Sequence, residues 1–552
     1  MREPVLLVRL LKCYWSAMRA YILIPFLGMW IGNVWSGQAS SGIQSNDSVP
    51  SQGTKRYPVT GTVSNSVTGE PLRHALVRIG QFSAFSSADG RFQIDGVPEG
   101  QYVAAAQRPG FFDPSQAGYI ATPLPTITVG PNTPSVALVL VPESVIEGRV
   151  LNNTGEPVEN AQVQVISEQI VGGRKTLQAA GMWNTDDAGE YRIENLVPGR
   201  YYVQVLQQPV FELGNGAAAG STREVYPEQF YPNAPDLTSA QALPLRPGDS
   251  ARVDFTVAPK SAVRVSGVTA PAAPNGIFAT LQNTSGEETQ IAIQFNPRNG
   301  KWTLPFVPPG TWNVVFRAQD QPGEAYYGEQ RIEVRSSDIE NLQLALQPLP
   351  TVPVHIVNAA DTQAQSVQLR LFPQNERRLN RQEFVATPSG GNPSGPLFLR
   401  DVAPGAYTVV TQSNGQFCVD SVTSGSTDLT RDPLLVSLGS PPQPVQVALR
   451  EDCATLEVMI QPQEHPGTRT VILTSDSPAF EPKLAALGAG PSAQFGPLTP
   501  GTYRLYQVPN PNNLEYANPE ALRNLEPQEI TLAPNQHGTI SLSAVAAGAA
   551  SQ

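Results

Sequence analysis

Apolar and polar residues alternate over short segments along most of the chain. The segments 59–63, 201–205, 253–257 and 342–346 place an apolar side chain at every second position. This period of two is typical of strands with one buried and one solvated face. A helical period is indicated only for 519–525. The pattern therefore predicts an all-β protein.

One short motif recurs five times. In each copy a proline stands one or two residues before a glycine, and an aromatic residue follows two residues after it. The glycines lie 99, 111, 95 and 96 residues apart. That period matches one immunoglobulin-sized sandwich per copy. These glycines are Gly100, Gly199, Gly310, Gly405 and Gly501.

The motif predicts a turn followed by a strand. Proline presets φ near −65°, and we expect the glycine to take the positive φ of a type II turn. In three copies a second polar turn, at Gly90, Gly189 and Gly300, precedes the strand before the motif. Such turns between alternating segments indicate β-hairpins.

These repeats predict a tandem array of five antiparallel β-sandwiches. The opening strands place domain 1 at 57–142, domain 2 at 143–259, domain 3 at 260–348 and domain 4 at 349–450. Domain 5 follows at 451–552 and includes a short tail. One domain's last strand leads almost directly into the next domain's first strand, so we expect a semi-rigid array.

The N-terminal residues predict export. Positive charges up to Arg19 precede an apolar run at 20–35, and small residues then form a cleavage site, so 1–39 is expected to be a signal peptide. Residues 40–56, rich in Ser, Gln and Gly, are expected to be a disordered spacer. An uncleaved membrane anchor is the alternative. A periplasmic, outer-membrane-associated or extracellular location follows.

Composition excludes one class of partner. Charged residues make up only 15% of the 552 residues, and 36 basic against 47 acidic residues give a net charge of −11 without any block of one sign. A mildly acidic surface of this kind does not suit a phosphate backbone. We expect no nucleic-acid partner, and contact with a membrane only through an uncleaved signal anchor.

The first two copies carry a fuller pattern that resembles a known family. Gly69-Glu70-Pro71 and Gly155-Glu156-Pro157 each stand before the polar turn and the Pro-Gly-Tyr motif. This pattern resembles the carboxypeptidase regulatory-like domain of multi-copy exported bacterial proteins. The resemblance implies a transthyretin-like (prealbumin-like) sandwich that accompanies carboxypeptidases and has no catalytic residue. It also allows carbohydrate binding, which related sandwiches show.

The sequence offers little catalytic chemistry. Only four histidines are present, and none has the spacing that a zinc peptidase requires; they are His74, His355, His465 and His537. The chain has no G-x-S-x-G elbow, no C-x-x-C pair and no phosphate-binding loop. We expect no enzyme, no cofactor and no metal site. An enzyme with a site between domains is the remaining alternative of that class.

Two features outside the strand pattern are candidates for a role. Cys418 and Cys453 are the two cysteines beyond the predicted signal peptide, and exported chains favour disulfides; two free buried thiols are the alternative. Aromatic clusters follow the motif in several copies and could be exposed ligand platforms, or caps on the sandwich cores. The candidate ligand-binding residues are Tyr226, Phe230, Tyr231, Tyr326 and Tyr327.

The sequence as a whole predicts a non-catalytic, exported binding or structural module of the cell envelope. Its expected partner is a glycan or an envelope protein. The alternative is a protein–protein adaptor or spacer subunit in an envelope transport or secretion assembly.

Overall fold

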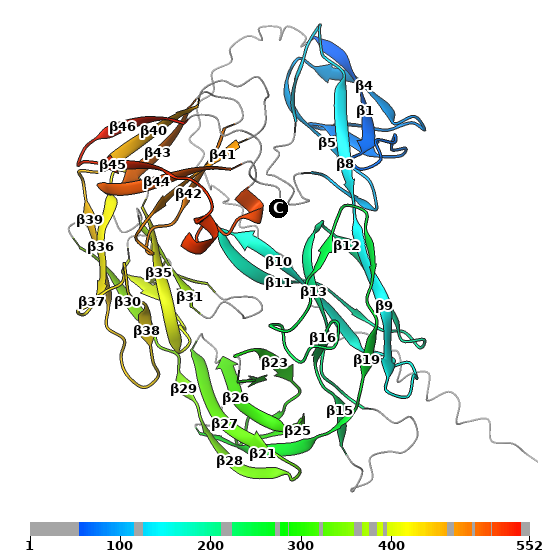
Figure 1. Ribbon diagram of the computed structural model, residues 1–552, viewed down its shortest axis with the longest axis vertical. Coiled ribbons are helices and arrows are strands. Elements are labelled where there is room, and N and C mark those ends of the chain that lie inside the picture. The colour runs from blue at the N-terminus through cyan, green and yellow to red at the C-terminus, as the bar shows by residue number, and fades with distance from the viewer. Residues whose placement is uncertain are drawn as a thin grey trace, which may run out of the picture. The chain divides into compact units, whose positions relative to one another are not determined.

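The computed structural model describes most of the five predicted domains. The described residues are 55–114, 125–210, 223–270, 276–284, 286–319, 324–357, 367–374, 383–389, 395–413, 415–460, 469–487, 492–508 and 511–542. The predicted signal peptide, nearly all of the predicted spacer and His465 lie outside these residues. The described chain consists of β-strands joined by short turns, apart from two 3-10 helices (Figure 1).

Domain 1 shows the plan that all five sandwiches follow. In one sheet, β1 (Arg56–Asn65) runs antiparallel to β4 (Arg91–Pro98) and parallel to β8 (Val136–Pro142), and β6 (Phe111–Phe112) pairs with β8. The second sheet is antiparallel, in the order β3 (Phe82–Phe85), β2 (Leu76–Ile79), β5 (Gly100–Gln107) and β7 (Thr126–Val129). Apolar residues of both sheets form one core. The parallel first-to-last pair is a feature that the predicted antiparallel sandwich did not include.

Domain 2 repeats this plan with longer strands. Its first sheet has the order β12-β9-β18, with β19 also on β9, and its second has the order β11-β10-β13-β16, with β17 on β13. These strands are β9 (Ser144–Asn152), β10 (Gln162–Val171), β11 (Arg174–Asn184), β12 (Glu190–Leu196), β13 (Gly199–Val205), β16 (Gln229–Phe230), β17 (Leu243–Leu245), β18 (Ser250–Arg252) and β19 (Phe255–Val257).

A small third sheet lies at the boundary between domains 2 and 3. β15 (Glu224–Tyr226) pairs with β14 (Gln208–Pro209) on one side and with β20 (Lys260–Ser261) on the other. The predicted boundary assigned β20 to domain 3, whereas its partner strand belongs to domain 2. Hydrogen bonding therefore continues across this boundary.

Domain 3 has the sheet orders β24-β25-β21-β28 and β23-β22-β26-β27-β29. β21 again pairs antiparallel with the strand before the motif, β25, and parallel with β28. The strands are β21 (Val263–Ala270), β22 (Ile277–Gln282), β23 (Glu288–Ile291), β24 (Gln294–Asn296), β25 (Lys301–Val307), β26 (Gly310–Gln319), β27 (Ala325–Val334), β28 (Ile339–Ala345) and β29 (Gln347–Pro348).

Domain 4 has the sheet orders β33-β34-β30-β39-β36-β37 and β32-β31-β35-β38. β30 pairs with β34 and, in parallel, with β39. The strands are β30 (Val352–Val357), β31 (Val367–Pro373), β32 (Phe384–Val385), β33 (Thr387–Pro388), β34 (Leu397–Leu399), β35 (Gly405–Ser413), β36 (Cys418–Ser424), β37 (Thr427–Asp428), β38 (Leu434–Val436) and β39 (Val445–Arg450).

Domain 5 has the sheet orders β43-β40-β46 and β42-β41-β44-β45. Two 3-10 helices lie between β44 and β45, and the second falls within the segment predicted to be helical. Among the residues that the structure describes, no helix is long and apolar enough to cross a membrane. The elements are β40 (Ala454–Ile460), β41 (Arg469–Ser475), β42 (Lys483–Leu487), β43 (Ser492–Leu498), β44 (Gly501–Val508), η4 (Pro511–Asn513), η5 (Pro519–Leu522), β45 (Gln528–Leu532) and β46 (His537–Leu542).

The five-fold motif connects the two sheets of each sandwich, but it is not a type II turn. φ is positive, as predicted, at Gly100, Gly310 and Gly405, but its values of 159°, 149° and 157° lie far from the value of about 80° in a type II turn, and Gly199 and Gly501 are not among the residues with positive φ. The following strand begins at the glycine itself in every copy. The predicted turn type is therefore wrong, whereas the predicted strand is correct.

The aromatic residue of the motif fixes this corner in four copies. Its side chain reaches back across the proline and glycine and donates a hydrogen bond to the carbonyl oxygen four residues earlier. A tyrosine corner of this kind ties the start of one strand to the end of the preceding strand. The bonds run from Tyr201 to Val197, from Trp312 to Pro308 (2.9 Å), from Tyr407 to Ala403 (2.7 Å) and from Tyr503 to Thr499 (2.6 Å).

The polar glycine turns were predicted to be hairpins, and two of the three are not. The turn at Gly90 joins β3 to β4, and the turn at Gly189 joins β11 to β12, and each pair of strands lies in different sheets. At Gly300 the turn does join two paired strands, β24 and β25. In domains 1 and 2 the strand before the turn is already paired with its other neighbour, so the chain changes sheets instead.

Candidate functional site

The predicted aromatic platforms are parts of domain cores. Tyr226, Phe230 and Tyr327 are only 8%, 6% and 6% exposed, and Tyr231 and Tyr326 are half-buried against the cores of domains 2 and 3. Phe230 on β16 and Tyr326 and Tyr327 on β27 belong to the main sheets, and Tyr226 lies on β15 of the small third sheet. Stacking on a ligand needs accessible ring faces. Of the two interpretations, exposed platforms and core caps, the burial of these rings favours the core caps.

Large apolar side chains are exposed on edge strands instead. Met182 and Trp183 on β11 are 52% and 55% exposed, and Phe85 on β3 is 66% exposed. β11 and β3 are outer strands of their sheets. The stretch 176–184 has no charge and no proline, which is a sequence feature of an exposed apolar outer strand. The alternation of apolar and polar residues alone does not distinguish it from other strands.

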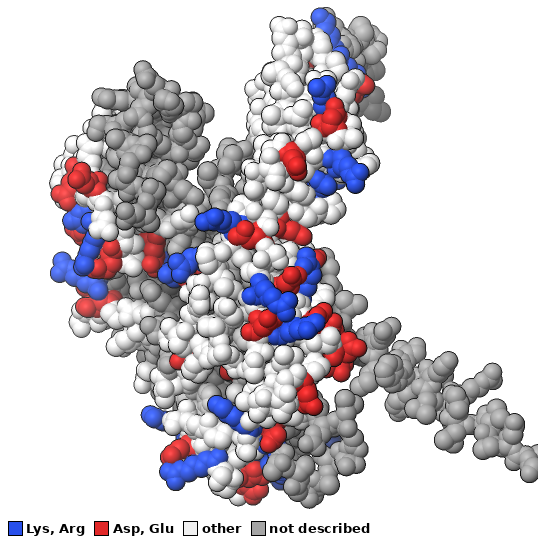
Figure 2. Space-filling model, turned by 45° about the vertical axis from the view of Figure 1, so that its right-hand side comes forward, with Lys and Arg blue, Asp and Glu red and all other residues white. Residues whose placement is uncertain are grey.

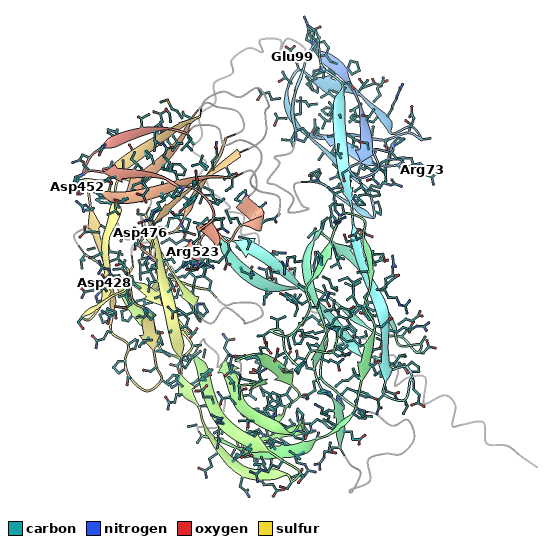
Figure 3. All side chains as sticks on the ribbon, viewed as in Figure 1. Arg73, Glu99, Asp428, Asp452, Asp476 and Arg523 are labelled. Carbon is teal, nitrogen blue, oxygen red and sulfur yellow. A yellow bond between two sulfur atoms is a disulfide. The ribbon has the colours of Figure 1, made fainter. Side chains whose placement is uncertain are left out.

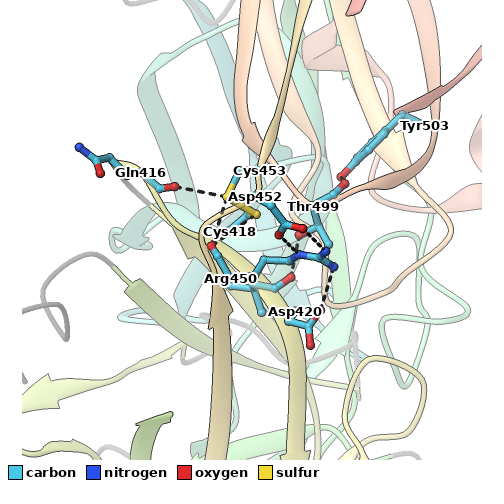
Figure 4. A network of polar contacts seen from close by, with 9 residues as sticks. Gln416, Cys418, Asp420, Arg450, Asp452, Cys453, Thr499 and Tyr503 are labelled. Carbon is cyan, nitrogen blue, oxygen red and sulfur yellow. Dashed lines mark hydrogen bonds and ion pairs between the residues drawn. A yellow bond between two sulfur atoms is a disulfide. The ribbon is translucent and has the colours of Figure 1, made fainter. Parts of the chain in front are cut away.

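The junction between domains 4 and 5 is covalently tied. Cys418 at the start of β36 and Cys453 just before β40 form a disulfide with a Cα–Cα distance of 5.8 Å (Figure 4). Beside it, the guanidinium of Arg450 donates to both carboxylate oxygens of Asp452 and to Asp420. Donation from Arg450 holds the pKa of Asp452 below its usual range. The disulfide and this network fix the few residues that link the two domains (Figure 4). Figure 3 marks the place of Asp452 in the fold.

Further contacts cross this junction away from the linker. The hydroxyl of Thr499 donates to the Val419 carbonyl at 2.6 Å, and the Thr411 amide donates to the Ala479 carbonyl at 3.1 Å. Arg370 of domain 4 forms an ion pair with Glu481 of domain 5. Contacts of three kinds, covalent, hydrogen-bonded and ionic, therefore set the relation between the two domains.

A cleft of about 840 Å³ lies between these contacts. Domain 4 lines it with β35 and β36, and domain 5 lines it with the segment around β42 and with the motif at Gly501. Gly172, at the tip of the β10–β11 hairpin, and Tyr516 complete the lining. The amide of Ala517 donates to the Gly173 carbonyl at 2.9 Å, which attaches that hairpin tip to domain 5.

The cleft contains partly buried charges. Burial lowers the pKa of Lys483, and the nearby charge of Glu481 opposes this effect; the ammonium donates to the Pro497 carbonyl at 3.3 Å. Among the described residues, Nε of Arg370 and one carboxylate oxygen of Glu481 are buried without a hydrogen-bond partner. Buried polar atoms of this kind are uncommon in native proteins and usually have a reason.

The junction between domains 2 and 3 is held by polar contacts. Arg223 pairs with Asp338 at 2.9 Å, and Gln207 donates to the Phe306 carbonyl at 3.0 Å. A pocket of about 370 Å³ here encloses Glu228, to which the hydroxyl of Thr289 donates. Burial raises the pKa of Glu228 to about 7. No sequence pattern marks this carboxylate, because its burial depends on a second domain.

The charged surface is sparse and mixed. Figure 2 shows basic and acidic residues interspersed among wide uncharged areas on the face in view. Among the residues that the structure places, no three His, Cys, Asp or Glu side chains are grouped as metal ligands. His537 instead contacts the Thr455 hydroxyl through Nδ1 at 2.6 Å.

The sequence matches one protein-family model in two places. The model is the carboxypeptidase regulatory-like domain, and it matches residues 58–139 and 145–258. Domains 1 and 2 are therefore carboxypeptidase regulatory-like domains, and the chain is an all-β array that contains two of them. No curated protein matches the sequence.

Several solved structures are similar to parts of this chain. The Bacillus anthracis TIE protein is 15% identical, with 52% of this chain covering 51% of that protein and a TM-score of 0.17. A streptococcal ancillary pilin is 9% identical over 52% of this chain and 99% of its own, with a TM-score of 0.18. The major pilin BcpA of Bacillus cereus is 9% identical over 73% and 98%, with a TM-score of 0.13. This chain thus spans about half of the TIE protein, and scores this low carry no argument about function.

Proposed function

We propose that this chain is a non-catalytic, exported scaffold of the cell envelope that binds a glycan. The observation that carries the proposal is the junction between domains 4 and 5. There a disulfide, an interdomain ion pair and two interdomain hydrogen bonds hold successive sandwiches around a polar cleft. A spacer needs fixed junctions, and a binding protein needs a concave polar surface.

Export is supported by two independent features of the chain. Residues 1–39 have the charge, apolar run and small residues of a signal peptide. The pairing of Cys418 with Cys453 suits an oxidising compartment outside the cytoplasm. A periplasmic, outer-membrane-associated or extracellular location is therefore part of the proposal.

The absence of catalysis is also part of the proposal. The chain has four histidines and two cysteines beyond the predicted signal peptide, which leaves few ways to build a nucleophile with its base. The resemblance of domains 1 and 2 implies accessory domains. An incubation of the full-length protein with peptide and glycan substrates, followed by product analysis, should show no turnover.

A protein–protein adaptor in an envelope assembly is the second candidate. It is favoured by β11, an outer strand on which Met182 and Trp183 are exposed. The part of β11 from 176 to 184 has no charge, and an outer strand of this kind can accept a strand from another protein. The adaptor reading predicts that the substitutions Met182→Lys and Trp183→Lys abolish capture of an envelope protein and leave glycan retention intact.

The direct test is retention on insoluble polysaccharides. Purified full-length protein should be retained on at least one cell-wall or plant polysaccharide and should release no soluble sugar. Cell fractionation should find the native protein outside the cytoplasm. A cytoplasmic location or release of sugar would refute the respective part of the proposal.

A further inference from the structure

The side chains around the cleft between domains 4 and 5 are balanced in charge. Arg370 and Lys483 are its two cationic residues, and Asp420 and Glu481 are its two anionic residues. Six serine and threonine hydroxyls, two tyrosines and two amide side chains also line the cleft. A ligand with a strong net charge of either sign would therefore meet a repelling group.

The same cleft offers both donors and acceptors. Lys483 has three donor hydrogens and one described acceptor, the Pro497 carbonyl. The amides of Gln412 and Gln494 and the serine and threonine hydroxyls of the lining can each donate and accept. An apolar ligand would bury these groups without compensation, which is costly. A hydroxyl both donates and accepts and can satisfy either kind of group.

We propose that this cleft binds a neutral oligosaccharide. The inference rests on the proposed function and deepens it, because it assigns the glycan site and the charge class of the ligand. Hydroxyls of the sugar replace water on the polar walls, and Phe480, whose ring lies 5.5 Å from that of Tyr503, supplies apolar surface beneath them. The volume of about 840 Å³ lies within the range of small-ligand sites.

Two exposed glutamines test this assignment without disturbing the junction. Gln412 on β35 and Gln494 on β43 line the cleft from opposite domains, and both are exposed. The double variant Gln412→Ala, Gln494→Ala removes two hydrogen-bonding groups. The matched control is Gln178→Ala, Gln294→Ala, which removes two exposed amides outside the cleft.

Isothermal titration of the full-length protein provides the measurement. The probes are neutral hexaoses of glucose, xylose and mannose, an anionic hexagalacturonate, and an uncharged, polar peptide. At least one neutral hexaose should bind, with affinity lowered about fivefold or more in the cleft variant and unchanged in the control. Unchanged thermal melting should show that both variants remain folded.

Three results would overturn the assignment. These are equal affinity in the cleft variant and the wild type, binding of only the anionic hexaose or only the peptide, and binding of no probe. A wrong assignment of the glycan site to this cleft can be distinguished from a wrong proposal of glycan binding. If the cleft variant is still retained on insoluble polysaccharide, the glycan site lies elsewhere; if the wild type is not retained, the glycan part of the function itself is wrong.

Discussion

Glu228 makes the junction between domains 2 and 3 sensitive to pH. Its carboxyl group lies in the pocket between the two domains, and burial raises its pKa from an ordinary value of 4.5 to about 7. Donation from Thr289 opposes this rise, and the charge of Glu287 adds to it. Around it, Glu288 pairs with Arg317 at 2.9 Å, and Lys260 lines the same pocket.

The sign of the effect follows from the direction of this pKa. Because the carboxyl loses its proton less readily in the folded protein, the stability that its neutral form provides is complete below pH 4.5. That stability falls as pH rises toward 7 and is lost above about pH 7. The difference between the two pKa values corresponds to roughly 3 kcal/mol.

The substitution Glu228→Gln removes the titration and keeps the shape. The amide oxygen can still accept the Thr289 hydroxyl, but the side chain can never ionise. Hydrogen exchange of β15 and β23 in the full-length protein, corrected for the intrinsic pH dependence of exchange, reports the opening free energy of this junction. Between pH 5 and pH 8 the wild type should lose about 3 kcal/mol of opening free energy, and the variant should lose almost none.

Glu333→Gln is the matched control, because Glu333 is an exposed carboxylate in domain 3, with 63% of its side chain accessible. It should keep the wild-type pH profile. The reasoning would be refuted if Glu228→Gln lost as much protection between pH 5 and pH 8 as the wild type.

Three further predictions concern single structural features. Mass spectrometry should find that Cys418 and Cys453 are not alkylated until the protein is reduced, and two alkylated thiols in the native protein would contradict this. Replacing both cysteines by Ser should lower the stability of the junction by about 3 kcal/mol in calorimetry. Tyr407→Phe removes the donor to a motif carbonyl and should destabilise domain 4 by about 1–2 kcal/mol in urea unfolding, and an unchanged midpoint would count against the corner. Gly148→Ala places a methyl group 1.7 Å from the Val253 carbonyl oxygen and should cost about 3 kcal/mol or more; a neutral effect on melting would show that β9 can shift.

The sequence predicted the repeated sandwich well because its signals are local. Alternation identifies strands, and the motif marks where the second sheet is entered in every copy. The predicted type II turn at the motif was wrong because the conformation of the glycine does not determine how the chain turns there. Tyr407 and its counterparts define it through a bond to a carbonyl four residues earlier, and this bond forms only when the ring packs in the core.

Two of the three predicted hairpins, those at Gly90 and Gly189, were wrong for a different physical reason. A turn sequence such as the one at Gly189 indicates that the chain reverses direction. It does not indicate whether the strands before and after the turn pair with each other. β11 pairs with β10, and β12 pairs with β9 in the other sheet. The turn at Gly189 therefore connects two sheets. Pairing is decided by long-range partners, which a local pattern does not contain.

The candidate site was the least predictable part. Aromatic residues such as Tyr226 and Tyr327 stood out in the sequence because they interrupt the alternation, yet they do so as caps of the cores. The cleft is formed by Gly172 and by residues from Arg370 to Tyr516, which belong to separate domains, and none of its side chains has a distinctive sequence neighbourhood. Only the cysteine pair at the same junction was visible as a candidate beforehand.

The central claim is that this array of sandwiches binds glycan without altering it. The most direct measurement is the retention of purified full-length protein on a panel of insoluble polysaccharides, with analysis of the supernatant for released sugar. The account predicts retention on at least one polysaccharide, competition by a neutral oligosaccharide and no released sugar. Complete recovery of the protein in the unbound fraction across the panel, or release of sugar, would contradict it.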